Sequence, residues 1–269
     1  MLRSIIRFNR KCSEWLSYRL PQNRPPDLFD DYIRTVIEKM NERPGLLVAD
    51  VGGGRSCRFS AHRKTEPKAR IVAIDISDEE LKLNNDVDDK RVANIMQSLP
   101  FKKKEIDMLV SSSVLEHLED IELFIANASR ALNDNGWFIH LCPSKFASFS
   151  VINQLLPQAL SKRIVHFIRP ETVGICGFPA HYNRCYPSAM KAMLTKHGFE
   201  PVEIRVSYFE TYWDFCFPLF VLVSLYETLA FYAGFKNLAT YMLIVSRKKP
   251  DAVPAIVSSP LAGKGRERG

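Results

Sequence analysis

An acidic residue and a run of glycines in the first third of the chain have the types and spacing of a ligand-binding turn. Asp50 lies near the end of the apolar run LLVADV, and Gly52, Gly53 and Gly54 follow it. Glycines let the backbone turn sharply and approach a ligand without a Cβ in the way. We expect a helix to begin just beyond Gly54, with its first N–H groups facing the same ligand. A purely structural turn would also use glycine, so the flanking residues must decide between a ligand-binding turn and a structural one.

The spacing around the glycines separates two kinds of nucleotide site. A dinucleotide-binding G-x-G-x-x-G pattern needs a small third residue at position 57, where this chain has Cys57. A nicotinamide-dependent oxidoreductase is therefore disfavoured. The run from Asp50 to Ser56 is instead Asp-x-Gly-x-Gly-x-Ser. It resembles the first motif of class I S-adenosylmethionine-dependent methyltransferases, (Asp/Glu)-x-Gly-x-Gly-x-Gly, with serine in place of the last glycine.

Further segments resemble the same family in the same order, over roughly residues 44–145. They are IVAIDI, ANIMQSLPF followed by Ile106-Asp107, SSSVLEHLED and RALNDNGWFIHLCPS. In the family, the acid at the position of Asp75 accepts hydrogen bonds from the ribose hydroxyls. Asn94 stands where the family often has aspartate, so an adenine contact there would come from a neutral amide. The resemblance implies S-adenosylmethionine as cofactor and cofactor contacts from Asp50, Gly52, Gly53, Gly54, Asp75, Ile76, Asn94, Ile95 and Ser111.

The methyl acceptor has to be bound by residues outside these motifs. The sulfonium methyl is already activated, so the protein must chiefly align the acceptor and exclude water, with a general base needed only for a protonated acceptor. His117, near the carboxyl edge of the expected sheet, and the adjacent His181 and Tyr182 are the candidate catalytic residues. Each has a structural alternative, as a residue that packs a helix end or fixes its own loop. His140 lies inside an apolar strand and is expected to be a core histidine.

Apolar strands alternate with helical segments from Leu46 to Pro143, which predicts a parallel sheet with right-handed crossovers. With the resemblance, the expected fold is α/β: a doubly wound, mostly parallel seven-stranded sheet. The expected parts are a basic amphipathic arm (1–26), a methyltransferase domain (27–247) and a disordered tail (248–269). Within the domain, residues 44–145 form the cofactor-binding core and residues 146–236 the acceptor-side region.

Composition limits the compartment and the partners. The net charge of +7 favours an anionic partner, and much of the basic excess lies at the two ends of the chain. The six cysteines include no Cys-x-x-Cys pair, which argues against a zinc site and a disulfide framework, so no metal is expected. We expect a cytoplasmic protein. The Arg-rich, acid-poor N-terminus leaves a mitochondrial presequence as an alternative.

An apolar insertion, YWDFCFPLFVLVSLYETLAFYAGF, precedes the last expected strand. Its length approaches that of a membrane span, but Pro218 and Glu227 interrupt it and the next strand must return to the same sheet. It therefore either packs on its own domain or lies at a membrane surface beside the basic arm. A methyltransferase with an apolar segment near its final strands resembles enzymes that act on lipids, quinones or lipid-linked glycans. This resemblance implies a small-molecule, lipid or lipid-linked glycan acceptor, and the insertion with the basic arm favours a peripheral membrane location. A nucleic-acid methyltransferase is disfavoured because no base-flipping motif is present, and a non-catalytic cofactor-binding partner at a membrane remains the other alternative. Nothing indicates an oligomeric state.

Overall fold

The computed structural model describes residues 2–157, 163 and 179–251. Within them, seven strands form one sheet in the order β3-β2-β1-β4-β5-β7-β6. The strands are β1 (Leu47–Val51), β2 (Arg70–Asp75), β3 (Asp89–Val92), β4 (Ile106–Ser112), β5 (Leu132–Pro143), β6 (Phe199–Ser207) and β7 (Tyr241–Lys248). Neighbouring pairs from β3 to β5 are parallel, and β7 runs antiparallel to both β5 and β6. The predicted mostly parallel seven-stranded sheet is confirmed.

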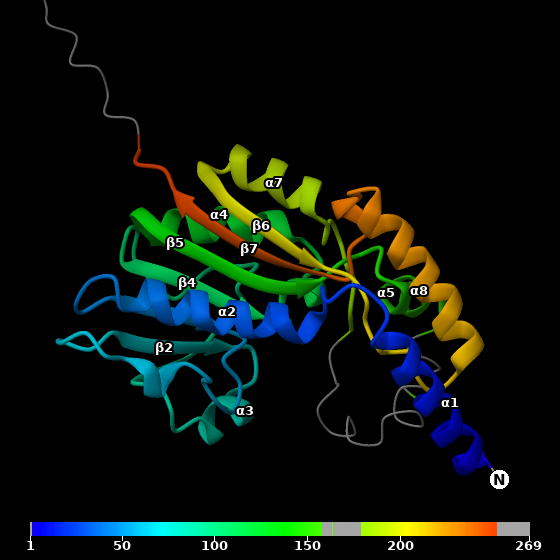
Figure 1. The fold of residues 1–269 in the computed structure, drawn as a ribbon. Helices are drawn as coiled ribbons and strands as arrows, with labels where there is room; N and C mark the ends of the chain where they lie inside the picture. The colour runs from blue at the N-terminus through cyan, green and yellow to red at the C-terminus, as the bar shows by residue number, and fades with distance from the viewer. Residues whose placement is uncertain (1, 158–162, 164–178, 252–269) are drawn as a thin grey trace, which may run out of the picture.

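Helices cover both faces of this sheet, as Figure 1 shows. They are α1 (Leu2–Ser17), α2 (Pro25–Met40), α3 (Asp78–Leu83), α4 (Ile121–Ala131), α5 (Ser148–Leu155), α7 (Pro187–Lys196) and α8 (Phe217–Tyr232), with short 3-10 turns at Ser60–His62, Leu115–His117 and Lys236–Leu238. The apolar side of α2 packs on one face of the sheet, while α4 and α7 pack on the other. The outcome is a three-layer domain with a core on each side of the sheet.

Local sequence explains where several helices begin. Ser77 accepts a hydrogen bond from the backbone of Glu80 and so caps α3. Asp120 accepts hydrogen bonds from the backbone N–H groups of Glu122 and Leu123 and caps α4. Because α4 starts at Ile121, His117 does not open that helix but ends the 3-10 turn before it.

One predicted element is wrong: no α-helix follows the glycines of β1. The chain from Gly52 to Ala69 consists of turns and the 3-10 turn Ser60–His62. Its sequence offers few apolar side chains to bury, chiefly Cys57 and Phe59, so no apolar helical stripe can pack on the sheet. Side chains of the β2–β3 connection hold it instead, since Asp86 accepts a hydrogen bond from Cys57 N and Asn84 donates one to Gly53 O.

The predicted helical arm and apolar insertion are both present. The arm forms α1, and the insertion contains α8. In the chain, α8 follows β6 and precedes β7, and it contacts α1 (Figure 1). Of the helices in the described part of the chain, none combines the length and apolarity needed to cross a bilayer. Lys248 is the last residue of β7, and the predicted tail lies outside the described residues from position 252 onward.

Candidate functional site

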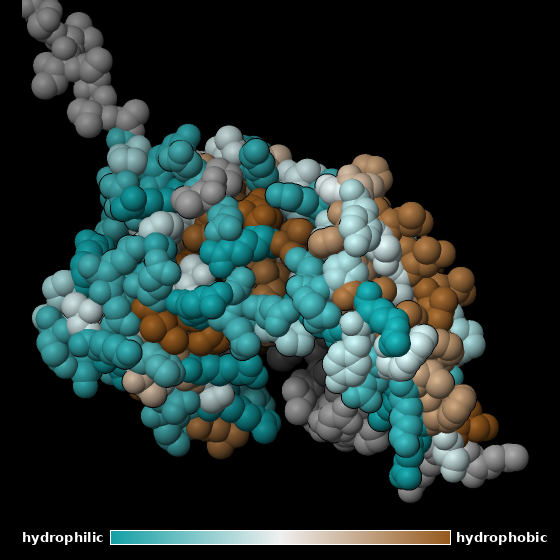
Figure 2. Space-filling model, viewed as in Figure 1, coloured by the Kyte–Doolittle hydropathy of each residue, from teal (hydrophilic) through white to brown (hydrophobic). Residues whose placement is uncertain are grey.

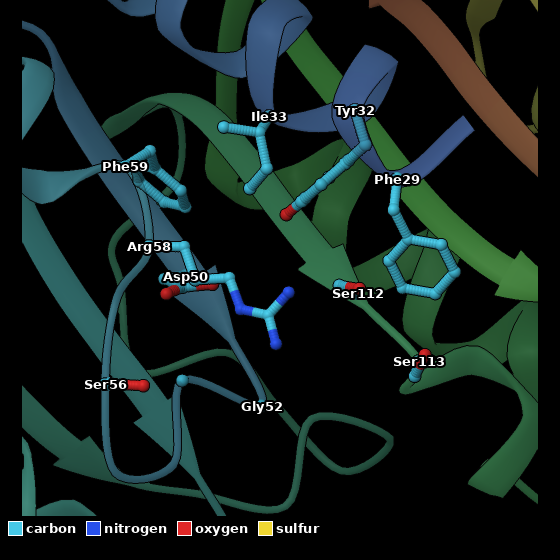
Figure 3. A pocket seen from close by; sticks show the side chains of 11 residues that line it. Phe29, Tyr32, Ile33, Asp50, Gly52, Ser56, Arg58, Phe59, Ser112 and Ser113 are labelled. Atoms are coloured by element: carbon cyan, nitrogen blue, oxygen red, sulfur yellow. The ribbon is translucent and has the colours of Figure 1, made fainter. Parts of the chain in front are cut away.

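A cavity of about 270 Å³ opens at the carboxyl edge of the sheet, between the ends of β1 and β4. The chain leaves β1 toward β2 on one side and returns to β4 on the other, so this is the switch point at which open α/β sheets bind ligands. Residues of α2, of the segment after β1 and of the end of β4 line the cavity (Figure 3): Phe29, Tyr32, Ile33, Asp50, Gly52, Gly53, Ser56, Arg58, Phe59, Ser112 and Ser113.

The glycine turn forms the floor of this cavity for steric reasons. Gly52 has φ +69°, and a Cβ on it would lie 2.3 Å from Cγ2 of Val114. A Cβ on Gly53 would lie 2.8 Å from the Cβ of Ala73. Both amides donate to the carbonyl of Ile74, at 2.7 and 3.2 Å, which fastens the turn to β2. Side chains are therefore excluded here, and the turn presents backbone toward the cavity.

Asp75, at the end of β2, is tied to this turn. Its Oδ2 accepts a hydrogen bond from Gly54 N at 3.1 Å, and its Oδ1 accepts one from Ser77 N at 3.0 Å. Each carboxylate oxygen keeps a second lone pair for a ligand hydroxyl. Ile76 follows with its side chain 58% exposed, an apolar surface beside the carboxylate.

Asp50 is a buried acid with a perturbed pKa. Its side chain lies by Tyr32 and Cys57, and burial raises its pKa to about 7, with the hydrogen bond from Cys57 lowering it and the charge of Asp75 raising it further. Burial and the neighbouring Asp50 also raise the pKa of the Cys57 thiol, so that thiol is a hydrogen-bond donor. A cationic ligand group entering the cavity would stabilise the ionised form of Asp50.

Asn94 and Ile95 follow β3 and do not line the cavity. Asn94 Oδ1 accepts a hydrogen bond from Met96 N at 3.1 Å, which forms a tight turn. Asn127 of α4 donates to the carbonyls of Ile95 and Met96 at 3.0 and 3.1 Å and fixes this turn to the domain. The Ile95 side chain is buried, whereas its neighbours Asn94 and Met96 are partly exposed.

Ser111, one of the expected cofactor contacts, does not line the cavity. Ser111 is fully buried, and its hydroxyl lies 2.5 Å from Nδ1 of His140. The strand alternation places the next residue, Ser112, toward the cavity instead, followed by Ser113. His140 is a core histidine as expected: it packs between Phe124 and Phe138, and burial lowers its pKa to about 3.

The three predicted acceptor-side residues come together at a second place on the same edge. The backbone N–H groups of His181 and Tyr182 donate to the carbonyl of Glu116, at 2.7 and 3.0 Å, and His117 Nδ1 lies 2.8 Å from the carbonyl of Pro179. Since a carbonyl only accepts, Nδ1 carries the proton in the neutral ring and Nε2 is the basic nitrogen. Burial lowers the pKa of His117.

Tyr182 and Glu116 give this second cluster its electrostatic character. Tyr182 has φ +52° and a buried side chain, and burial raises its pKa to about 12, so its hydroxyl acts as a donor. Burial raises the pKa of Glu116 to about 8, its Oε1 lies 3.9 Å from His117 Nε2, and its Oε2 has no hydrogen-bond partner. Glu116 is therefore protonated at neutral pH, beside the one nitrogen of His117 that can accept a proton.

Several site residues escape sequence reasoning. Phe29 and Ile33 belong to the helical apolar pattern of α2, so the sequence marks them as core, although they also line the cavity with Tyr32. Glu116 sits beside the predicted His117, yet only its burial distinguishes it from a surface glutamate. In the part of the chain that is described, no group of three or more His, Cys, Asp or Glu side chains is placed to hold a metal ion.

The switch-point cavity, the glycine turn after β1 and the acid at the end of β2 agree with the predicted resemblance, as does the sheet with one reversed strand. Residues 49–140 match the family model described as "Methyltransferase domain". Over those residues the match confirms the predicted resemblance to the S-adenosylmethionine-dependent methyltransferases, and with it the expected methyl donor. No curated protein sequence matches the chain.

Solved structures share the fold at low sequence identity. Geranyl diphosphate C-methyltransferase from Streptomyces coelicolor A3(2), solved with Mg²⁺, geranyl diphosphate and S-adenosyl-L-homocysteine, is 15% identical with a TM-score of 0.51, over 82% of this chain and 80% of that chain. An S-adenosylmethionine-dependent methyltransferase from Mesorhizobium loti is 14% identical with a TM-score of 0.51, over 80% and 95%. The [4+2]-cyclase SpnF is 15% identical with a TM-score of 0.52, over 82% and 81%.

Proposed function

We propose that this protein transfers the methyl group of S-adenosylmethionine to a small apolar or lipidic acceptor, working at the periphery of a membrane. The observation that carries the proposal is the joint placement of the glycine turn and two carboxylates at the switch point. Asp75 holds Gly54 N, and Asp50 lies on the same side of the sheet in the cavity wall. This arrangement suits a ligand with ribose hydroxyls at one end and a cationic amino acid at the other.

The proposed cofactor contacts follow from the chemistry of each group. Asp75 accepts hydrogen bonds from the ribose hydroxyls, while the exposed side chain of Ile76 packs on the adenine. The turn at Asn94 and Ile95 flanks the other side of the adenine. Asp50 faces the ammonium end of the methionine moiety, because a carboxylate with a pKa near 7 is held ionised by a nearby cation. The backbone of Gly52 and Gly53 allows the cofactor to approach β1.

On the acceptor side, we assign His117 as the group that takes a proton when the acceptor carries one. Its Nε2 is the basic nitrogen, and its lowered pKa keeps the ring neutral at pH 7. Tyr182 donates a hydrogen bond that orients the acceptor, since its raised pKa keeps the hydroxyl protonated. His181 completes the cluster from the same loop.

A row of aromatic side chains supports an apolar acceptor. Phe29 in the cavity wall contacts Tyr241 at 5.4 Å between ring centroids, and Tyr241 contacts Phe149 at 5.9 Å. The row continues from Phe149 to Tyr212 at 5.2 Å and from Tyr212 to Trp213 at 5.5 Å, just before α8. Rings of this kind bind apolar chains and flat molecules. The fold neighbour from Streptomyces coelicolor has geranyl diphosphate, an apolar chain with a polar head, as its named substrate.

Two measurements test the proposal. Calorimetric titration with S-adenosylmethionine, with NADH as the control ligand, should show saturable binding of the first alone. Methyl-labelled S-adenosylmethionine should then transfer its label to the organic phase of a lipid extract. Label in added RNA or DNA would establish the nucleic-acid alternative. Cofactor binding without transfer to lipids, aqueous metabolites or nucleic acid would leave a non-catalytic binding protein, and absence of cofactor binding by the folded protein would refute the proposal.

A further inference from the structure

The helix α8 exposes large apolar residues on the side that faces away from the domain. Its inner side buries Phe220, Val223 and Ala230 together with Ser224 and Glu227. On the outer side, large apolar residues are exposed at helical spacing: Leu222 (65%), Leu225 (56%), Leu229 (63%) and Tyr232 (75%). Figure 2 shows the resulting hydrophobic surface along α8. An exposed apolar surface of this extent is typical of a site that binds a protein partner or a membrane.

The helix α1 lies beside α8 and is fixed to its start. Asn9 accepts a hydrogen bond from Phe217 N at 2.9 Å, Ser13 donates to the carbonyl of Asp214 at 3.0 Å, and Arg10 lies 3.4 Å from the carboxylate of Asp214. Figure 1 shows the two helices side by side, at the end of the molecule away from α3. The arm is therefore part of one surface with α8.

The exposed side of α1 combines large apolar and basic residues. Ile5, Phe8, Trp15 and Tyr18 are more than half exposed. Arg7, Lys11 and Arg19 are exposed among them, and the guanidinium of Arg19 lies 3.8 Å from the centre of the Trp15 ring. Basic residues interleaved with Trp and large apolar side chains are the composition of helices that lie in the plane of a membrane interface.

We propose that the α1–α8 face (Ile5, Phe8, Trp15 and Tyr18 with Leu222, Leu225, Leu229 and Tyr232) docks on an anionic lipid bilayer. The apolar residues enter the boundary between headgroups and acyl chains, and Arg7, Lys11 and Arg19 contact the anionic headgroups. A second copy of the chain is a poorer occupant. A twofold interface through this face would bring two basic α1 helices together, at an electrostatic cost.

A bilayer bound at the α1–α8 face would supply the lipidic acceptor for the proposed methyl transfer. This part of the inference rests on the proposed function. The aromatic row from Phe29 ends at Trp213, which packs with Phe220 and Val223 of α8 and with Leu16 of α1. Contacting side chains therefore connect the proposed bilayer face with the wall of the cofactor cavity. We expect a lipidic acceptor to enter from this side of the molecule.

The test is co-sedimentation of the full chain with vesicles of phosphatidylcholine mixed with phosphatidylglycerol, and with vesicles of phosphatidylcholine alone. We expect binding to the mixed vesicles that weakens as salt is raised. Lys11→Gln should weaken it about fivefold, whereas Lys191→Gln on α7 should have no effect. Leu225→Glu should weaken it at least about tenfold, whereas Leu123→Glu, at a similarly exposed site on α4, should not.

Three results would overturn the inference. They are no vesicle binding, equal binding to both lipid mixtures, or a concentration-dependent dimer that Leu225→Glu dissociates. Calorimetry with S-adenosylmethionine on the same preparations separates this inference from the proposed function. Leu225→Glu should bind the cofactor like the unmodified chain, which also shows that the variant is folded. Vesicle binding by a chain that does not bind S-adenosylmethionine would refute the proposed function and leave the docking face.

Discussion

Asp75 offers the sharpest test of the proposed cofactor site, because its two oxygens already have known partners. Oδ2 accepts from Gly54 N and Oδ1 from Ser77 N, so the carboxylate ties the glycine turn to the start of α3. Removing the side chain in Asp75→Ala would loosen this tie and also remove the proposed ribose contacts. The two effects have to be separated by the design of the measurement.

A ligand that lacks the ribose hydroxyls separates them. Each hydrogen bond to a charged carboxylate contributes about 1.5 kcal/mol or more, so loss of two should weaken S-adenosylhomocysteine binding to Asp75→Ala about a hundredfold. The unmodified protein should lose a similar factor when it is titrated with an analogue lacking both hydroxyls. Asp75→Ala should bind that analogue almost as tightly as it binds S-adenosylhomocysteine. The cycle of two proteins and two ligands then gives a coupling free energy of about 3 kcal/mol.

Calorimetric titration of both proteins with both ligands completes the cycle. If Asp75 only supports the glycine turn, the variant would discriminate between the two ligands as strongly as the unmodified protein does. Such additivity would refute the assignment of Asp75 to the ribose. Asp75→Asn is the matched variant, because it keeps the shape but sets an amide N–H against one of the two backbone donors, Gly54 N or Ser77 N, and it should weaken binding as well.

Three further predictions concern protonation and sterics. Because S-adenosylmethionine should bind the ionised form of Asp50, its affinity should rise with pH up to the pKa of about 7 and level off above it, by up to about tenfold per pH unit. Calorimetry in two buffers of different ionisation enthalpy would show the released proton, and a flat profile from pH 5.5 to 8 would contradict the assignment. His117→Gln should lower kcat of label transfer about 10²-fold or more with the KM for the cofactor unchanged, and more than His181→Gln does; an unchanged acid limb of the pH profile in His117→Gln would exclude it as the base. Gly52→Ala and Gly234→Ala both place alanine at positive φ, but only the first meets an atom within 4 Å. Gly234→Ala should cost about 1 kcal/mol in urea unfolding and Gly52→Ala about 1–3 kcal/mol more, and equal costs would contradict the close packing on Val114.

The fold could largely be predicted because its strands are buried on both faces. The strands with the sequences RIVAID and IDMLVSS each contain four consecutive buried residues, as parallel strands between two helical layers must. The edge strand Asp89–Val92 has no such signal, since half of its residues are exposed and its sequence, DKRV, is mostly charged. The sequence of the glycine turn also does not predict whether a helix follows Gly54, because such a turn is compatible with either a helix or an irregular segment.

The site was predicted less completely than the fold, for two reasons. The glycine turn and Asp75 are set by local steric and hydrogen-bonding needs that leave a sequence pattern. Ser111 and Ser112 are adjacent on one strand and face opposite sides, and the sequence pattern alone does not show which of the two faces the cavity. The cluster of Glu116, His117 and Tyr182 depends on contacts across some 65 residues of chain, which no local pattern encodes.

The reversal of β7 has a consequence for how this domain can vary. Ser207 and Tyr241 are register partners at the ends of β6 and β7, and Thr240 N donates to Ser207 O at 2.8 Å, so the 33-residue excursion between them leaves and re-enters the sheet at one point. The entropy of closing such a loop grows only slowly with its length. Its buried apolar residues form clusters of their own, which contact the cores of the sheet at Val206 and, through Phe149, at Tyr241. Residues 208–240 are therefore an exchangeable module: a relative could replace them with a tight hairpin, keep its donor site and change where, and on what, it works.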